Sequence, residues 1–214
     1  MKIVAMIPVK LNNERLPGKN IKKLGDKPLA HYLFDTISRV KNIDETYVFC
    51  SDPKVEEYIH TNAKFLKRDK RLDSPETNFT DIFNDFCKII QADIYVVSHV
   101  TSPFIQKETF EKCIDAVRKG DYDSAFSAIA IRDFLWKEDG TPIGFDPGNI
   151  PRSQDLEPVY CESNAIFVFK RELFEKTKRR VGFNPYIAEV SGKEAVDINY
   201  EKDFEYAEYL LSKE

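Results

Sequence analysis

The chain has 214 residues, of which 42% are hydrophobic and 13% aromatic, so it is long enough to bury a full core, and we expect one domain over residues 1–214. Its formal net charge of −4 excludes nucleic acid as the main partner, since such proteins carry a strong basic excess, but it does not exclude a small anionic ligand. No stretch approaches the roughly 20 apolar residues of a membrane span, and the first apolar run is too short for a signal peptide.

The N-terminal segment predicts a buried strand that ends in a cationic loop. Residues 3–7 are an apolar run rich in β-branched side chains, which is typical of an interior strand of an α/β sheet. The loop over residues 8–20 then carries Lys10, Arg15 and Lys19. Ligands of such sheets bind beyond the carboxyl ends of the strands, and these cations suit a polyanion such as a nucleoside triphosphate. The alternative is an ordinary solvated, charged loop.

Helical and strand patterns alternate along the rest of the chain. The predicted helices cover residues 28–40, 55–62, 81–90, 107–119, 171–180 and 203–211. The predicted strands cover residues 46–50, 63–66, 93–98, 124–131, 165–169 and 195–198. Because short connections between alternating elements favour parallel, right-handed crossovers, we expect an α/β fold with a doubly wound, mostly parallel sheet.

The segment over residues 134–158 departs from this alternation. It is rich in Gly, Pro and Asp and has no regular period, which is typical of an excursion or flap. Phe134, Trp136 and Phe145 make it too apolar for a free loop, so we expect a homodimer contact here. The alternative is that the segment packs against the body of its own chain.

Polar clusters follow several of the predicted strands, at residues 8–20, 51–52, 98–103 and 197–203. In a parallel sheet these strand ends share one edge. The first cluster could hold phosphates, and the third could line a base or ribose pocket. Asp197 and Asp203 offer carboxylates to a hard cation such as Mg²⁺, although Asp197 could be a turn residue and Asp203 is more typical of a helix cap.

The four cysteines do not have the CxxC spacing of a zinc site. Cys50, Cys87 and Cys113 lie in apolar segments, where a free thiol behaves as a small hydrophobe. We therefore expect free thiols, no zinc, and a reducing, cytoplasmic environment.

Short motifs along nearly the whole chain form one ordered pattern. The N-terminal signature is carried by Ile7-Pro8-Val9-Lys10, by the run from Arg15 to Asn20, and by the run from Leu24 to Leu29. Further motifs, in chain order, are Ser51-Asp52, Arg68, Thr101 to Phe104, Arg152 to Leu156, Pro158, Tyr160, Asp197-Ile198 and Asp203-Phe204. These motifs, in this order, resemble those of one enzyme family, the acylneuraminate cytidylyltransferases.

This resemblance implies a homodimeric enzyme with a Rossmann-like nucleotidyltransferase fold. Such an enzyme uses CTP and Mg²⁺ and transfers CMP to the anomeric hydroxyl of a nine-carbon 2-keto sugar acid, with release of pyrophosphate. The partners implied are therefore CTP, a small sugar-acid acceptor and a second copy of the chain, with neither nucleic acid nor membrane.

The resemblance also implies roles for individual residues. The implied catalytic residues are Lys19, Arg15 and Asp197, with Lys19 stabilising charge on the transferred phosphate. The implied nucleotide-binding residues are Pro8, Lys10, Leu11, Asn12, Arg15, Lys19, Asn20, Arg68, Thr80 and His99. The implied acceptor-binding residues are Thr101, Ser102, Arg152, Gln154, Tyr160 and Glu162. The implied metal ligands are Asp197 and Asn199.

The chain departs from the family's usual pattern at several of these places. It has Lys10 for Arg, Asn13-Glu14 for Ser-Lys, His99 for Gln, Ser163-Asn164 for Asn-Gly, and Asn199 for a second Asp. Because the amide of Asn199 carries no charge, a metal should bind more weakly or depend more on the nucleotide's phosphates. Glu14 places an anion in the phosphate loop, and His99 is either a base or ribose contact or a packed strand-end histidine.

These departures leave alternatives to an ordinary sialic acid acceptor open. The acceptor could be legionaminic acid, pseudaminic acid, an eight-carbon keto acid or an acid outside the sugars. The chain could instead be a catalytically lapsed relative that binds CTP without releasing pyrophosphate. A transferase that uses UTP or GTP on a sugar phosphate is disfavoured, because the first loop lacks the glycine-rich pattern of those enzymes.

Overall fold

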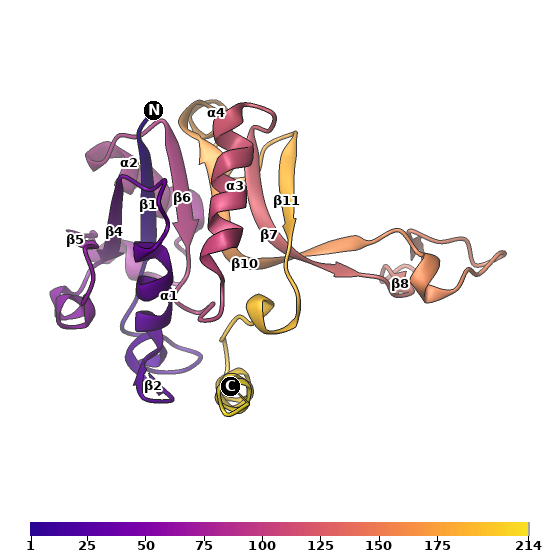
Figure 1. The fold of residues 1–214 in the computed structure, drawn as a ribbon, viewed down its shortest axis with the longest axis horizontal. Helices are drawn as coiled ribbons and strands as arrows, with labels where there is room; N and C mark the ends of the chain where they lie inside the picture. The colour runs from indigo at the N-terminus through magenta and orange to yellow at the C-terminus, as the bar shows by residue number, and fades with distance from the viewer. Residues whose placement is uncertain (214) are drawn as a thin grey trace.

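The computed structural model describes residues 1–213 and contains a central sheet with helices on both faces (Figure 1). The strands of this sheet are β1 (Ile3–Pro8), β4 (Glu45–Cys50), β5 (Lys64–Lys67), β6 (Ile94–Ser98), β7 (Ser124–Ile131), β10 (Val159–Lys170) and β11 (Pro185–Glu189). The helices are α1 (Leu29–Ser38), α2 (Phe79–Ile89), α3 (Lys107–Lys119), α4 (Arg171–Thr177) and α5 (Glu201–Leu211). Two small hairpins pair β2 (Lys23–Leu24) with β3 (Lys27–Pro28), and β8 (Leu135–Trp136) with β9 (Pro142–Ile143).

The strand order across the seven-stranded sheet is β11-β7-β10-β6-β1-β4-β5. β10 is antiparallel to both of its neighbours, β6 and β7, and the other neighbouring pairs are parallel. The expected mostly parallel α/β sheet is therefore confirmed. Since β1, β4 and β6 are parallel, the loops after Pro8, Cys50 and Ser98 leave the sheet at the same edge.

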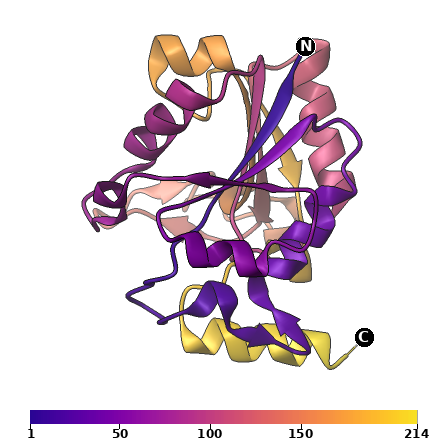
Figure 2. The ribbon, with the colours of Figure 1, turned by 90° about the vertical axis from the view of Figure 1, so that its left-hand side faces the viewer.

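Alternation along β1 assigns its side chains to two separate helical layers. Ile3, Ala5 and Ile7 are buried in a cluster with side chains of α1 and α3. Val4 and Met6 point the other way, into a cluster with side chains of α2 and α4. Figure 2 shows these two layers on opposite sides of the sheet.

Helix α5 lies against the β2–β3 hairpin, beyond the carboxyl ends of the central strands (Figure 2). Leu24, Leu29 and Phe204 are buried together there. Asp203 Oδ2 accepts hydrogen bonds from the backbone amides of Asn199 at 2.9 Å and Tyr200 at 2.8 Å. Asp203 therefore helps to cap the helix from its third residue, whereas the N-cap position belongs to Tyr200 and not, as predicted, to Asp203. This cap fixes the chain just before α5 at the sheet edge.

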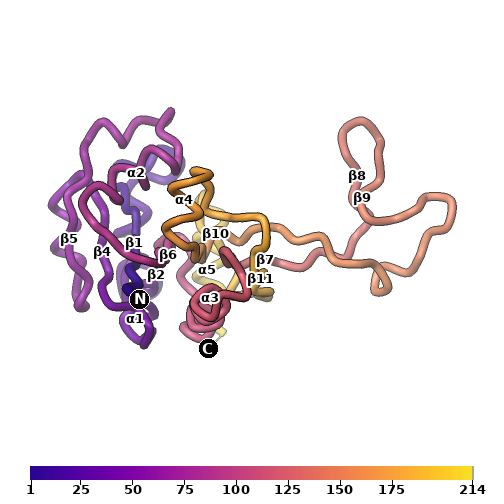
Figure 3. Tube along the Cα trace, turned by 90° about the horizontal axis from the view of Figure 1, so that it is seen from above, coloured from indigo at the N-terminus to yellow at the C-terminus, as the bar shows by residue number. Residues whose placement is uncertain are grey.

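Residues 132–158 form an arm that projects from the sheet between β7 and β10 (Figures 1 and 3). The β8–β9 hairpin lies on this arm, where the Phe145 ring packs against Phe134 and Trp136 at centroid distances of 5.1 Å each. Trp136 nevertheless remains 52% exposed. The segment predicted to be an excursion thus projects from the sheet and does not pack on the body of its own chain.

Several element predictions were wrong. Residues 195–198 are not a strand, since a 3₁₀ turn at Gly192–Ala195 is followed by irregular chain, and the sheet gains the unpredicted edge strand β11 instead. A 3₁₀ helix at Pro53–Tyr58 replaces the helix predicted over residues 55–62. β10 begins at Val159 rather than residue 165. Its first half was not predicted, because those residues are mostly exposed at the base of the arm and lack an apolar pattern.

The four cysteines are free thiols, as expected. Within residues 1–213, no helix combines the length and the apolar composition that crossing a membrane requires.

Candidate active site

Lys19 is held at the carboxyl edge of the sheet by the local geometry of the first loop. Gly18 adopts the left-handed backbone conformation, with φ 66°, and starts the 3₁₀ turn Lys19–Ile21. The Lys19 side chain folds inward, where it is 7% exposed, and its Nζ donates to the backbone oxygen of Ile198 at 2.6 Å. Burial lowers the pKa of Lys19, and the carboxylate of Asp197 opposes that shift.

Asp197, Asn199 and Arg15 lie together beside this lysine. Asp197 Oδ2 accepts a hydrogen bond from Asn199 Nδ2 at 2.8 Å, and Asn199 Oδ1 accepts one from Arg15 Nη1 at 3.4 Å. Asp197 Oδ1 is buried and has no hydrogen-bond partner within residues 1–213. The structure thus brings together the four residues that sequence reasoning assigned to catalysis and metal binding.

Two adjoining pockets run along this edge and share Lys10. A pocket of about 330 Å³ is lined by Lys10, Asn13, Glu14, Arg15, Lys19, Pro75 and Asn199. A pocket of about 380 Å³ is lined by Pro8, Val9, Lys10, Arg68, Leu72, Asp73, Ser74, Pro75, Thr77, Phe79, Ile82, His99 and Arg180. The Glu14 carboxylate lies 3.8 Å from Lys10 Nζ and its side chain is 66% exposed, so this anion is directed largely to solvent.

Arg68 is a buried cation on the wall of the second pocket. Its Nη2 donates to Asp73 Oδ1 at 2.6 Å, and Ser51 Oγ donates to Asp73 Oδ2 at 2.5 Å. The Lys10 ammonium donates to the backbone oxygen of Asp73. Arg68 Nε is buried without an acceptor among the described residues, which leaves a donor for a ligand.

His99 follows β6 and lies within electrostatic reach of Arg180, Lys19 and Asp197. Burial, together with the positive charges of Arg180 and Lys19, lowers the pKa of His99 to about 4, against the attraction of Asp197. At neutral pH the imidazole is therefore neutral, with one nitrogen able to donate and the other able to accept. That state fits a contact with a base or ribose better than a contact with a phosphate.

The loop after His99 is tied directly to the chain before α5. The Thr101 backbone oxygen accepts a hydrogen bond from the Ile198 amide at 2.8 Å. Ser102 is fully buried, and within residues 1–213 its hydroxyl has no hydrogen-bond partner. The Thr101 backbone therefore lies next to the chain that carries Asp197, and the role assigned to Thr101 and Ser102 stays a prediction.

The other residues assigned to the nucleotide, Leu11, Asn12, Asn20 and Thr80, do not line the two pockets described above. Asn20 Nδ2 donates to the backbone oxygen of Lys10 at 2.8 Å and so orders the loop. Leu11 and Asn12 line a neighbouring pocket of about 310 Å³ with Ser51 and Asp52, rather than the pocket of His99. Thr80, on α2, directs its hydroxyl to the Lys178 backbone oxygen at 3.5 Å.

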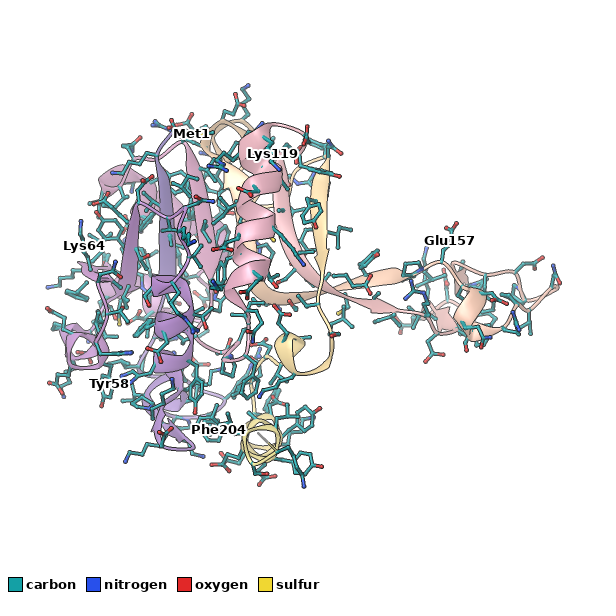
Figure 4. All side chains as sticks on the ribbon, viewed as in Figure 1. Met1, Tyr58, Lys64, Lys119, Glu157 and Phe204 are labelled. Atoms are coloured by element: carbon teal, nitrogen blue, oxygen red, sulfur yellow. The ribbon has the colours of Figure 1, made fainter. Side chains whose placement is uncertain are left out.

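Most of the assigned acceptor residues lie elsewhere in the chain. Arg152 and Gln154 are exposed on the arm, where Arg152 Nε pairs with Asp155 Oδ2 at 2.7 Å. Figure 4 labels Glu157 on the same arm, far from the central strands. Tyr160, at the base of the arm, donates to Glu189 Oε2 at 3.4 Å. Within one chain the arm carries these side chains away from the pockets. The expectation that they line an acceptor pocket together with Thr101 and Ser102 is therefore wrong for a single chain.

Arg180 is a pocket residue that sequence reasoning missed. It was placed at the end of the helix over residues 171–180, where a run of cations is typical of a solvated face. The structure ends α4 at Thr177 and gives Lys178 a left-handed conformation, with φ 58°, so the chain reverses and Arg180 turns back over the sheet. The basic run contained no signal of that reversal.

Comparison with known protein families identifies the family of this chain. Residues 4–213 match the family described as cytidylyltransferase. The chain belongs to the cytidylyltransferase family. The resemblance drawn from its motifs is confirmed by curated relatives, among them the N-acylneuraminate cytidylyltransferase of Oncorhynchus mykiss, which is 24% identical over 96% of this chain and 49% of the relative.

Other similar proteins carry different acids in their names. The pseudaminic acid cytidylyltransferase of Campylobacter jejuni is 25% identical to this cytidylyltransferase over 78% of each chain. The structure of a CMP:2-keto-3-deoxy-manno-octonic acid synthetase complexed with CTP superposes with a TM-score of 0.73 at 18% identity, over 100% of this chain and 99% of that one, which supports the fold. The chain spans about half the length of the N-acylneuraminate relatives it matches.

Proposed function

We propose that this cytidylyltransferase transfers CMP from CTP to the anomeric hydroxyl of a sialic-acid-like 2-keto sugar acid and releases pyrophosphate. The observation that carries the proposal is the buried Lys19 ammonium beside Arg15 and Asp197, at the edge of the sheet where its pockets lie. Names of relatives that act on sialic and pseudaminic acids support the choice of acceptor class. The four free thiols fit a cytoplasmic enzyme.

In the proposed reaction, the side chains act by position and charge. The acceptor hydroxyl attacks the α-phosphorus in line, the new oxygen–phosphorus bond forms, the bond to pyrophosphate breaks, and the hydroxyl proton passes to solvent. Lys19 and Arg15 donate hydrogen bonds to the phosphate oxygens, whose negative charge grows during transfer. Arg68 and Lys10 hold the nucleotide from the other side of the pocket, and no covalent enzyme intermediate is needed.

We propose Mg²⁺ as the cofactor, held by Asp197 with help from the amide oxygen of Asn199. No group of three or more His, Cys, Asp or Glu side chains in residues 1–213 is arranged to bind a metal, and in this proposal the nucleotide's phosphate oxygens and water supply the remaining ligands. The unpartnered, buried Asp197 Oδ1 fits this use, since Mg²⁺ in nucleotide sites commonly takes one or two carboxylates plus phosphates. When bound, the ion would neutralise charge on the departing pyrophosphate.

We further propose that the enzyme is a homodimer formed through the arm. Trp136 is 52% exposed and Ile150 is 64% exposed on a segment that projects from the body of its own chain (Figure 3). A second copy would cover these side chains. It would also bring Arg152 and Gln154 of each arm toward the partner's pockets, which explains why one chain alone does not assemble the assigned acceptor residues.

Replacing Trp136 and Ile150 together with aspartate should convert the dimer to a monomer, because two buried charges would oppose the contact. Light scattering across a concentration series measures the change. The matched control is Asp139→Asn, an exposed substitution in the turn between β8 and β9. A wild-type protein that is monomeric at working concentration would refute the proposed dimer.

Pyrophosphate release with CTP, Mg²⁺ and a panel of 2-keto sugar acids tests the activity. We expect release with CTP and at least one acid, and none with UTP, GTP or ATP, with the CMP-sugar confirmed by mass. Release only with an octulosonate or pseudaminic acid would replace the acceptor while keeping the reaction. CTP binding by calorimetry without release would identify a lapsed relative, and the absence of CTP binding would overturn the nucleotide site.

A further inference from the structure

Among the cationic side chains Lys10, Arg68 and Arg180 that line the second pocket, Arg180 has no role in the proposed binding of CTP. Its guanidinium carbon lies 3.6 Å from the centroid of the Phe167 ring and 5.1 Å from that of Phe79. Its side chain is 26% exposed, and Nη2 makes a long ion pair of 3.4 Å with Glu162 Oε2. The guanidinium therefore has a fixed aromatic platform and most of its five N–H donors still to satisfy.

The loop that carries Arg180 is fastened at its far end by Asp123. Asp123 Oδ2 accepts from the backbone amides of Phe183 at 2.8 Å and Asn184 at 3.1 Å. A Cβ on Gly182 would lie 2.3 Å from the same carboxylate, so only glycine allows this close approach. Arg180 is thus presented by an anchored turn rather than by a free basic tail.

Glu162, the ion-pair partner of Arg180, is also held in place. β10 is irregular between Glu162 and Phe167, where Asn164 takes a left-handed conformation with φ 57°. Ser163 Oγ donates to Ser127 Oγ at 2.7 Å, and Ser127 Oγ accepts from the Ile166 amide at 3.0 Å, so buried hydroxyls fix the bulge. Glu162, assigned to the acceptor from sequence, instead faces Arg180 and aligns its guanidinium.

The charges around the pocket favour an anion next to Arg180. Its other titratable wall residues are the cations Lys10 and Arg68, the imidazole of His99, and Asp73, whose carboxylate is already engaged by Arg68 and Ser51. His99 is influenced electrostatically by Arg180 as well as by Lys19 and Asp197. The pocket that Arg180 and His99 line shares Lys10 and Pro75 with the pocket of Lys19, so a molecule bound beside Arg180 would lie next to the transfer site.

We propose that Arg180 binds the carboxylate of the acid acceptor in a bidentate pair and thereby determines the requirement for an acidic acceptor. This inference rests on the proposed transferase function. In a 2-keto sugar acid the carboxylate and the anomeric hydroxyl are attached to the same carbon, so a clamp on the carboxylate aims the hydroxyl at the α-phosphorus. Arg152 is exposed on the arm and paired with Asp155, so within one chain Arg180, and not Arg152, lines this pocket, and in the proposed homodimer Arg152 would reach only the pocket of the partner.

The test compares Arg180→Met, Arg180→Lys and the matched control Arg179→Met, which changes an exposed neighbour that stacks on Phe183. Because Arg180→Met removes a bidentate pair of charge-assisted hydrogen bonds, we expect it to raise the acceptor KM about tenfold or more. The KM for CTP should stay within about twofold of wild type by the same reasoning, since no CTP contact is lost. Arg180→Lys should be intermediate, because lysine keeps the charge but not the fork.

A second experiment replaces the acceptor carboxylate with a carboxamide. We expect wild type to disfavour the amide and Arg180→Met to treat acid and amide alike. An unchanged acceptor KM in Arg180→Met, or a rise confined to the KM for CTP, would overturn the assignment. Thermal melting checks that each variant folds, and Arg180→Lys, which keeps a cation at this position, decides alone if Arg180→Met does not fold.

Binding separates failure of this inference from failure of the proposed function. If no acid supports pyrophosphate release by wild type, the function fails, and calorimetry with N-acetylneuraminate in the presence of CTP still decides the role of Arg180. Binding by wild type that Arg180→Met loses supports it. Equal binding by both proteins, or no binding by wild type, refutes it.

Discussion

Replacing Lys19 with methionine is expected to lower kcat about 100-fold or more, which is the usual loss when one preorganised donor to a developing negative charge is removed. Lys19 is buried, and Ile198 fixes its ammonium at 2.6 Å, so little reorganisation is needed when charge develops on the phosphate. Because a partly dehydrated cation interacts strongly with nearby anions, this ammonium should act more effectively than an exposed one. The measurement is steady-state pyrophosphate release with saturating CTP and acceptor.

Lys23→Met is the matched control, since Lys23 belongs to the same segment but is exposed on β2. It should leave kcat unchanged. Lys19→Met also leaves the Ile198 carbonyl without its donor, at a cost of about 1–3 kcal/mol in the free energy of unfolding, so urea denaturation is measured in parallel. A folded Lys19→Met protein with near-normal kcat would remove Lys19 from the mechanism.

The central part of the fold could be predicted because its patterns are local and strong. Residues 3–7 and 93–98 are nearly continuous apolar runs, and residues 107–119 have a clear helical period, so the strands β1 and β6 and the helix α3 followed directly. The rule that parallel strands share a carboxyl edge then brought the loops containing Lys19 and His99 together.

The missed parts depend on contacts between distant segments. β11 is a five-residue edge strand whose pairing with β7 has no local signature. The direction of the arm depends on β7 and β10 continuing as a ribbon beyond the sheet, which no residue in the arm specifies. Arg180 enters its pocket only because Lys178 reverses the chain and Asp123, far away in sequence, anchors the turn.

The departures from the family pattern gain physical explanations from the same geometry. Asn164 stands where the resemblance suggested glycine, and its left-handed φ of 57° is one that glycine adopts freely and asparagine tolerates better than most residues. Glu14 is directed largely to solvent near Lys10, so it does not place an unpaired anion against the phosphates. Neither of these two departures therefore argues for a lapsed enzyme, whereas Asn199 lies at the proposed metal site.

Replacing Asp197 with asparagine is expected to lower Mg²⁺-dependent turnover about 100-fold or more, because a metal that stabilises transferring phosphoryl charge contributes several kcal/mol. The change removes the charge next to Lys19 but keeps the shape of the side chain. Turnover measured across Mg²⁺ concentrations should show a higher half-activating concentration as well as a lower maximum. Calorimetric titration of CTP with and without Mg²⁺ gives a readout that does not depend on catalysis.

Asn199→Asp is the reciprocal change, and it should lower the Mg²⁺ concentration needed for half-maximal turnover. In the wild-type chain the Asn199 amide donates to Asp197 at 2.8 Å. An aspartate at position 199 would place two carboxylates side by side, and a bound cation would stabilise that pair. Without the cation, the two negative charges would repel each other. Glu201→Gln, which alters only a surface ion pair with Lys22, is the control and should leave the Mg²⁺ dependence unchanged. If Asp197→Asn keeps wild-type turnover at every Mg²⁺ concentration, Asp197 is not a metal ligand, and the buried oxygen that it presents must serve the acceptor instead.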